Sequence, residues 1–208
     1  MQDGTNHAAQ YSRAAARRRL RLANGRDAAQ NGTPTRPRGN APAGKLEMKI
    51  GDMDYDQVLR LFRALQLREV EYVIVGAIAL GLHGIVRSTQ DVDLFVKPTA
   101  ENIARLRDAI GDVWQDPAIA EIRADDLAGE FGVVSYVPPS GDLTIDVIAR
   151  LGEAFAFGDI EWHEIDAGGV MVRVATPRML FRMKRDTIRP QDAADAAVLR
   201  EKFEWEDV

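Results

Sequence analysis

Cysteine is absent from this chain of 208 residues, so disulfide bonds and thiolate metal sites are excluded. No run of eighteen apolar residues occurs, so we expect no membrane span. Histidine is scarce, and His83 and His163 are isolated residues without ligand spacing, so neither is assigned to a metal. With 46% hydrophobic residues, the chain is long enough to form one soluble domain with an appendage.

The net charge of −5 conceals a difference between the two ends of the chain. Residues 1–45 carry nine Lys and Arg against two Asp and Glu, a charge of +7. Residues 46–208 therefore carry eighteen against thirty, a charge of −12. An acidic domain of this kind does not attract nucleic acid by its net charge alone.

The basic segment of residues 1–45 has few large apolar side chains, and residues 31–44 are rich in Gly, Pro and Asn. It cannot bury enough surface to offset the entropy lost on ordering, so we expect a disordered tail. Three interpretations remain open. The segment is a tail without a role, arising from a start codon upstream of Met48 or Met53; or it is a nucleic-acid-binding arm; or it is an organellar targeting peptide.

The rest of the chain is organised around residues 71–96. An apolar, β-branched run at 72–75 ends at Gly76, a segment of small residues follows, and a second apolar run begins at Asp91. This order predicts a strand, a turn, a short helix at 77–83 and a strand at 91–97. Since strand side chains alternate between faces, Asp91 and Asp93 should share one face. Two adjacent carboxylates repel unless a cation lies between them, so the pair predicts a Mg²⁺ site for a nucleoside triphosphate.

Other periodicities predict the surrounding elements. Apolar residues recur at helical spacing at 54–68 and behind Thr99 as far as Gly111, which should end that helix. Thr176-Pro177 should cap a helix. The remaining predictions are a short helix within 117–128, antiparallel hairpins at 133–137 with 143–149 and at 160–165 with 170–175, and C-terminal helices at 177–185 and 190–203.

Asp146 lies between Ile145 and Val147 in the second strand of the first hairpin. A carboxylate is costly within an apolar run unless it meets a metal or a cation. Asp146 therefore joins Asp91 and Asp93 as a candidate ligand, the alternative being an ion pair with an arginine.

The segment Arg87-Ser-Thr-Gln-Asp-Val-Asp-Leu94, placed after a turn at Gly76-Ala77 and a short helix, resembles the nucleotidyltransferase superfamily that includes DNA polymerase β. It is most similar to minimal nucleotidyltransferases and to the nucleotidyltransferase toxins of bacterial toxin–antitoxin pairs. The resemblance covers about residues 50–203. It implies an α+β fold, with a small mixed β-sheet, helices packed on it and a helical C-terminal part at about 177–203.

The turn departs from the family pattern. Ala77 stands where the superfamily usually has Ser or Gly, so a hydroxyl contact to phosphate is lost, whereas a backbone N–H contact would survive. Gly76 would let backbone N–H groups approach phosphate, or it only forms a tight turn. Arg87 would clamp a phosphate or tie its loop to an acidic neighbour, and Thr89 would contact the nucleotide or brace the loop.

The resemblance also implies roles further along the chain. Asp91, Asp93 and Asp146 would bind two Mg²⁺ ions, with Mn²⁺ as a substitute. The segment Met183-Lys184-Arg185, followed by Arg189, Asp192 and Asp195, is similar to a downstream segment of the toxins. The similarity implies that Lys184 contacts the triphosphate and Asp192 holds two helices together, and it assigns Asp195 no role. The alternative for Lys184 is a solvated side chain.

The sequence thus predicts a cytoplasmic, metal-dependent nucleotidyltransferase that moves a nucleoside monophosphate from an NTP to a hydroxyl acceptor. A tRNA 3′ end or a protein side chain is favoured over a small molecule, and an antitoxin would be the partner if the chain is a toxin. A different class stays open, a non-catalytic interaction or regulatory module on the same scaffold, because fold does not fix function.

Overall fold

The computed structural model describes residues 54–129, 132–139, 143–151 and 153–205. The tail predicted at 1–45 and residues 140–142 of the first hairpin turn lie outside the described residues. Within them, no helix is long and apolar enough to cross a membrane.

A six-stranded mixed sheet forms the centre of the fold, with strand order β3-β4-β2-β1-β8-β7. β1 is antiparallel to β2 and parallel to β8, whereas β2 is parallel to β4. The hairpins β3–β4 and β7–β8 occupy the two edges. The strands are β1 (Tyr72–Ile74), β2 (Asp91–Val96), β3 (Val133–Tyr136), β4 (Thr144–Ile148), β7 (Trp162–Asp166) and β8 (Met171–Ala175). The α+β class with a small mixed sheet, as predicted, is confirmed.

Three of the helices begin at capping residues. The Asp54 carboxylate accepts hydrogen bonds from the first backbone N–H groups of α2, and Thr99 and Thr176 cap α4 and α6 in the same way. Proline opens both C-terminal helices, where its missing N–H costs nothing. The helices are α2 (Tyr55–Leu67), α3 (Gly76–Leu82), α4 (Ala100–Val113), α5 (Ala124–Leu127), α6 (Pro177–Lys184) and α7 (Pro190–Lys202).

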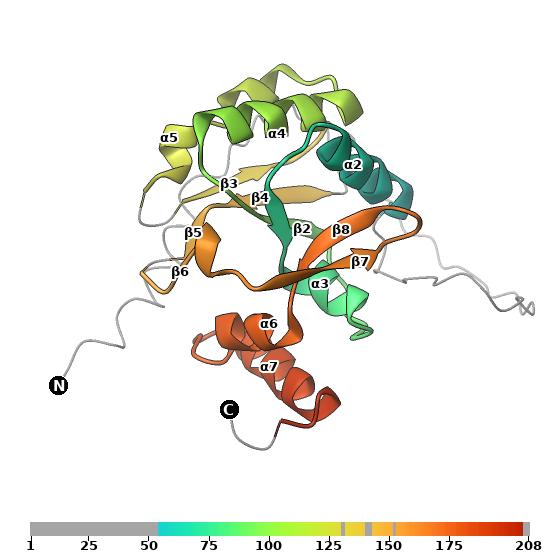
Figure 1. The fold of residues 1–208 in the computed structure, drawn as a ribbon, viewed down its shortest axis with the longest axis vertical. Helices are drawn as coiled ribbons and strands as arrows, with labels where there is room; N and C mark the ends of the chain where they lie inside the picture. The colour runs from blue at the N-terminus through green and yellow to red at the C-terminus, as the bar shows by residue number, and fades with distance from the viewer. Residues whose placement is uncertain (1–53, 130–131, 140–142, 152, 206–208) are drawn as a thin grey trace, which may run out of the picture.

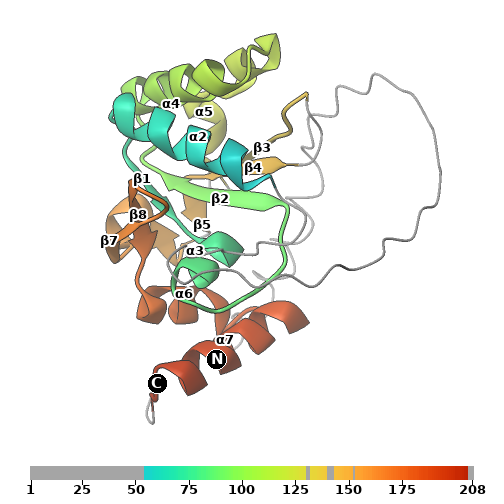
Figure 2. The same cartoon turned by 90° about the vertical axis from the view of Figure 1, so that its right-hand side faces the viewer.

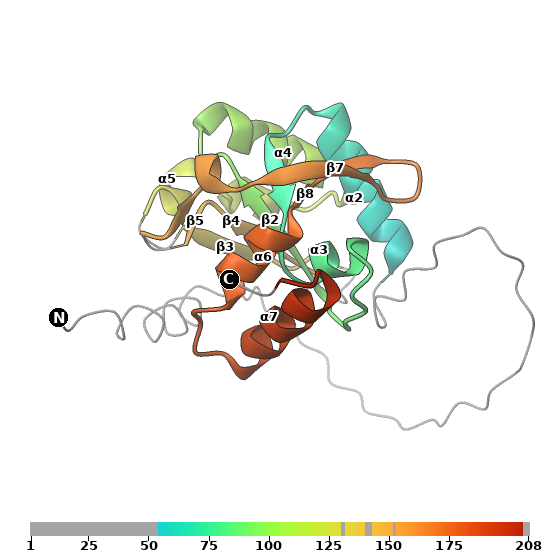
Figure 3. The ribbon, with the colours of Figure 1, turned by 60° about the horizontal axis from the view of Figure 1, so that its bottom comes forward.

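The helices lie on both sides of the sheet. α2 and α4 cover one side, and α3, α6 and α7 lie on the other (Figures 1 and 2). α6 and α7 lie side by side at one end of the molecule (Figure 3). The apolar faces of these elements meet in one core that includes Phe62, Phe95, Leu106 and Ile145, all fully buried. Burial of this apolar surface is the main source of stability.

Three details differ from the sequence-based expectations. α4 continues through Gly111 to Val113, since the φ of Gly111 is not in the left-handed region that would end a helix. Residues 150–156 form a small additional hairpin of β5 (Arg150–Leu151) and β6 (Phe155–Ala156), too short to give a periodic signal. The segment 117–128 contains a 3₁₀ turn (Pro117–Glu121) and α5 rather than one helix.

Candidate active site

Two carboxylates from distant parts of the sequence lie opposite each other on neighbouring strands. Asp93 of β2 is the direct parallel partner of Asp146 of β4. Asp91 also lies on β2, two residues earlier, where alternation places it on the same face as Asp93. The structure therefore brings together the acidic residues that the sequence singled out.

The carboxyl group of Asp93 has a strongly raised pKa. Burial raises its pKa to about 7, and the charges of Asp146 and Asp91 act in the same direction. The positive charges of Lys184 and Arg87 oppose this rise. A nearby cation would strongly stabilise the ionised form of a carboxyl group in these surroundings.

Ser135, on the edge strand β3, supports Asp146. The Ser135 hydroxyl donates a hydrogen bond of 2.5 Å to Oδ1 of Asp146, its antiparallel partner. Sequence reasoning did not identify Ser135, and the only signal was a polar residue alternating with Val134 and Tyr136 on a strand. The contact orients the carboxylate, and it compensates in part for placing Asp146 within an apolar run.

The backbone of Gly76 packs against the side chain of Asp93. Gly76 opens α3 with a φ of +67°, and a Cβ placed on it would overlap Oδ2 of Asp93 and lie 2.6 Å from Cγ. The backbone N–H of Val75 also donates to the carbonyl of Asp93, at 3.0 Å. Both the backbone conformation and the lack of a side chain at Gly76 are therefore required here. Ala77, the next residue, is buried.

The loop before β2 holds Thr89 and Arg87. The hydroxyl of Thr89 accepts from the backbone N–H of Asp91 at 3.0 Å, a contact that braces the loop. Arg87 donates through Nη1 to Oδ2 of Asp195 on α7, at 2.7 Å. In this structure Arg87 ties its loop to an acidic neighbour, one of the two roles expected from the sequence.

Lys184, at the end of α6, is buried rather than solvated. Its ammonium group lies 2.8 Å from Oδ1 of Asp192 and 2.8 Å from Oδ2 of Asp195. Asp192 also accepts from the Thr187 hydroxyl, and these cationic and polar partners hold the pKa of Asp192 below its usual value despite burial. Asp192 thus joins α6 to α7. Together, Arg87, Lys184, Asp192 and Asp195 are called the ionic cluster below.

Asp195 was not identified as a site residue by sequence reasoning. Its spacing three residues after Asp192 was visible, and on a helix this spacing puts both carboxylates on one face. The partner in the loop before β2, 108 residues away, could not be deduced from spacing.

The donor set fits Mg²⁺. Carboxylate oxygens are its preferred protein ligands. Burial first, and then the charges of Asp146 and Asp91, raise the pKa of Asp93, and a divalent cation would oppose both effects. Among residues 54–129, 132–139, 143–151 and 153–205, no three or more His, Asp and Glu side chains are already arranged as a metal site.

The two isolated histidines also meet in space. The rings of His83 and His163 lie 5.2 Å apart, edge to face, and Nε2 of His83 lies 2.8 Å from the carbonyl oxygen of Ala175. Burial, as the largest influence, lowers the pKa of His83. The pair links α3 to the β7–β8 hairpin.

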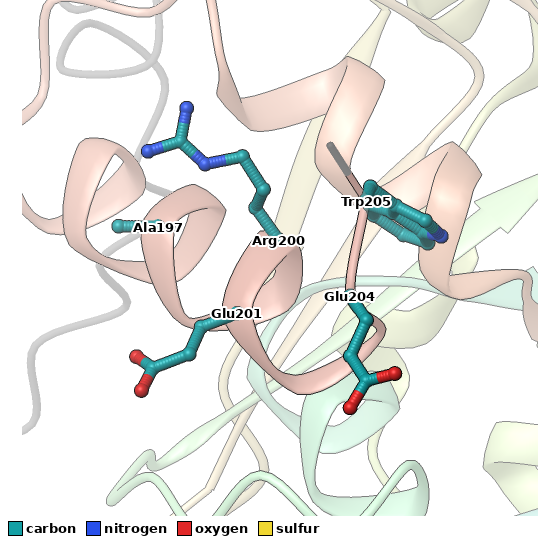
Figure 4. A pocket seen from close by; sticks show the side chains of 5 residues that line it. All are labelled: Ala197, Arg200, Glu201, Glu204 and Trp205. Carbon is teal, nitrogen blue, oxygen red and sulfur yellow. The ribbon is translucent and has the colours of Figure 1, made fainter. Parts of the chain in front are cut away.

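A surface hollow of about 480 Å³ lies at the C-terminal end of α7 (Figure 4). Its lining includes Arg200, Glu201 and Trp205. None of the residues that line it belongs to the ionic cluster or to the carboxylate site, which consists of Asp91, Asp93 and Asp146. It therefore takes no part in the site described above.

No protein-family model matches the sequence, and no curated protein matches it. Among solved structures, the chain is similar to a Thermotoga maritima protein described as a candidate nucleotidyltransferase, with 13% identity over 73% of this chain and 93% of that one and a TM-score of 0.45. It is similar to ANT(2″)-Ia in complex with adenylyl-2″-tobramycin, with 17% identity over 72% and 88% and a TM-score of 0.45. It is also similar to an antigenic nucleotidyltransferase-like protein of Paracoccidioides brasiliensis, with 16% identity over 72% and 77% and a TM-score of 0.45. Likenesses at these identities concern the fold and assign no activity to this chain.

Proposed function

We propose that this protein is a Mg²⁺-dependent nucleotidyltransferase that moves a nucleoside monophosphate from an NTP to a hydroxyl acceptor. The observation that carries the proposal is the pairing of Asp93 with Asp146 across β2 and β4, with the backbone of Gly76 packed against Asp93. Crowded carboxylates beside a glycine turn suit a metal-bound triphosphate.

The reaction exchanges a phosphoanhydride bond of the NTP for a phosphodiester bond to the acceptor. The acceptor oxygen forms a bond to the α-phosphorus, and the bond from that phosphorus to the bridging oxygen of the β-phosphate breaks. Pyrophosphate leaves, and the acceptor proton passes to a carboxylate of the site. Mg²⁺, when bound, would neutralise phosphate charge and stabilise the attacking and leaving oxygens. Asp91, Asp93 and Asp146 would hold it, as one ion or two.

The remaining residues of the site would position the substrate. The backbone at Gly76 and Ala77 would approach the phosphates, and the missing hydroxyl at Ala77 removes no N–H donor. Thr89 would keep the loop in register with Asp91, and Arg87 and Lys184 would supply positive charge to the triphosphate.

The acceptor we propose is a tRNA 3′ end or a protein side-chain hydroxyl, and the protein would act as the toxin of a toxin–antitoxin pair. This choice rests on the resemblance of residues 87–94 and of the segment around Lys184 to the nucleotidyltransferase toxins. An antitoxin would be its protein partner.

The proposal is tested with the four NTPs, each labelled at the α-phosphate, incubated with the protein, Mg²⁺ and either total tRNA or a cell lysate. We expect label on one acceptor class and release of one pyrophosphate per label. Transfer should stop with a chelator and in the Asp93→Asn variant. Absence of transfer from every NTP, together with no binding of Mg²⁺–NTP, would instead favour a non-catalytic module, the class that the Ala77 substitution keeps open.

A further inference from the structure

A single carboxylate oxygen in the ionic cluster accepts from two cations. Oδ2 of Asp195 lies 2.7 Å from Nη1 of Arg87 and 2.8 Å from Nζ of Lys184. The two cations come from different segments, the loop before β2 and the end of α6. One side chain of α7 therefore fixes where both positive charges lie.

Burial makes this arrangement rigid. Asp195 and Lys184 are each 8% exposed, and charges so far removed from water are costly unless they are paired. Two cations and two anions balance the cluster, so losing the charge of Asp195 would leave a buried cation without its counter-ion. Separating these side chains would therefore cost free energy.

The cluster also connects the carboxylate site to the C-terminal helices. Arg87 precedes Asp91 by four residues, in the loop that leads directly into β2. A second contact from the same helix, the ammonium of Lys202 to the carbonyl of Gly84 at 3.1 Å, fixes the start of that loop. α7 thus holds the loop at two points, 84 and 87, just before the acidic residues of β2.

The two cations retain donors for a further anion. A guanidinium has five N–H donors and an ammonium three. Arg87 gives one N–H to Asp195, and its buried Nε makes no hydrogen bond among the described residues. Lys184 contacts Asp192 and Asp195, which uses two of its three. Both cations therefore keep N–H donors that the contacts within the cluster do not use.

We propose that Asp195 is a positioning residue of the transfer reaction: it holds Arg87 and Lys184 side by side, so that both cations are in place for the phosphates of the NTP. The inference rests on the proposed function. Arg87 then has both roles expected from the sequence. Its ion pair with Asp195 holds the loop, and the same ion pair orients the guanidinium toward the phosphates.

Asp192 provides a matched comparison. It lies on the same helix, is equally buried at 8% exposed, and makes the same 2.8 Å contact to Lys184. Its other partners, Thr187 and Arg189, belong to the C-terminal segment, so it has no contact with the loop before β2 among those found. A purely structural cluster would make the two aspartates equivalent, whereas positioning through Arg87 would make Asp195 the more important one.

The test compares Asp195→Asn, Asp195→Glu and Asp192→Asn with the wild type by steady-state pyrophosphate release over an NTP series, with melting temperatures recorded. Both Asn variants should melt at lower temperature. Asp195→Asn should lower kcat/KM by roughly 10- to 100-fold, mainly through kcat, because small displacements of positioned groups cost about that much. Asp192→Asn should lose less than about fivefold, and Asp195→Glu should recover part of the rate.

Equal losses in the two Asn variants, or activity of Asp195→Asn within about threefold of wild type, would overturn this proposal while leaving the transferase intact. No pyrophosphate release by the wild type with any NTP would overturn the proposed function, and this inference with it. If Asp195→Asn does not fold, two substitutions that keep the charges test the proposal instead. Arg87→Lys shortens one side chain, and Asp195→Glu lengthens its partner. The double variant should then be faster than Arg87→Lys alone, and an equal or slower rate would contradict the positioning role.

Discussion

Replacing Asp93 with asparagine should stabilise the metal-free protein at neutral and higher pH. The pKa of Asp93 is raised from 3.8 to about 7, chiefly by burial and then by the charges of Asp146 and Asp91. The folded state therefore binds the proton more tightly than the unfolded state. Stability is lost as the pH rises from about 4 to about 7, because the unfolded carboxyl ionises first.

The size of the effect follows from the shift. A rise of about three pH units corresponds to roughly 4 kcal/mol, at about 1.4 kcal/mol per unit. Asparagine keeps the shape without the charge, so the gain in Asp93→Asn should approach a few kcal/mol at pH 8 and vanish near pH 4. Mg²⁺ should stabilise the wild type at pH 8 and have little effect on the variant.

The assay is urea unfolding of both proteins from pH 4 to pH 8, with a chelator and then with Mg²⁺. Taking the difference between variant and wild type at each pH removes the contributions of titrating groups that do not interact with Asp93. A difference that does not grow with pH would refute the electrostatic account of Asp93. A difference that grows with pH and is unchanged by Mg²⁺ would refute the metal assignment alone.

Three further predictions concern other parts of the account. Gly76→Ala should lower the free energy of unfolding, measured with urea, by at least about 1 kcal/mol, since alanine disfavours a φ of +67° and its Cβ would overlap the Asp93 carboxylate. It should also abolish pyrophosphate release. Wild-type stability together with wild-type release would contradict the packing described. Lys184→Ala should lower kcat/KM for the NTP by on the order of 10²-fold and lower the melting temperature, with partial recovery in Lys184→Arg; activity within about threefold of wild type would remove Lys184 from the site. A chain beginning at Met48 should fold and still transfer to a protein acceptor, and its tRNA affinity should fall with a flatter salt dependence if the segment 1–45 binds RNA; unchanged affinity and slope would leave that segment as a tail.

Local sequence signals predicted much of the fold. Capping residues such as Thr99 and Thr176 located helix starts, and alternation in β2 put Asp91 and Asp93 on one face. These features depend on neighbours within a few residues, which is why the sequence reveals them. Gly111 misled because glycine is permitted inside a helix as well as after it.

Long-range contacts of the site could not be predicted in the same way. The sequence grouped Asp146 with Asp91 and Asp93, but it did not give the register that sets Asp93 directly opposite Asp146, which joins two parallel strands about fifty residues apart. The contact of Arg87 with Asp195 depends on how α7 docks. Ser135 acquires its role only from its cross-strand partner. Such contacts follow from packing of the whole chain, which no local pattern encodes.

The central claim is that Asp91, Asp93 and Asp146 hold a metal-bound NTP, and calorimetric titration of the NTP tests it most directly. We expect binding in the presence of Mg²⁺, loss of binding with a chelator, and no binding by Asp93→Asn at any Mg²⁺ concentration used for the wild type. NTP binding that is equally tight without Mg²⁺, or in Asp93→Asn, would contradict the claim.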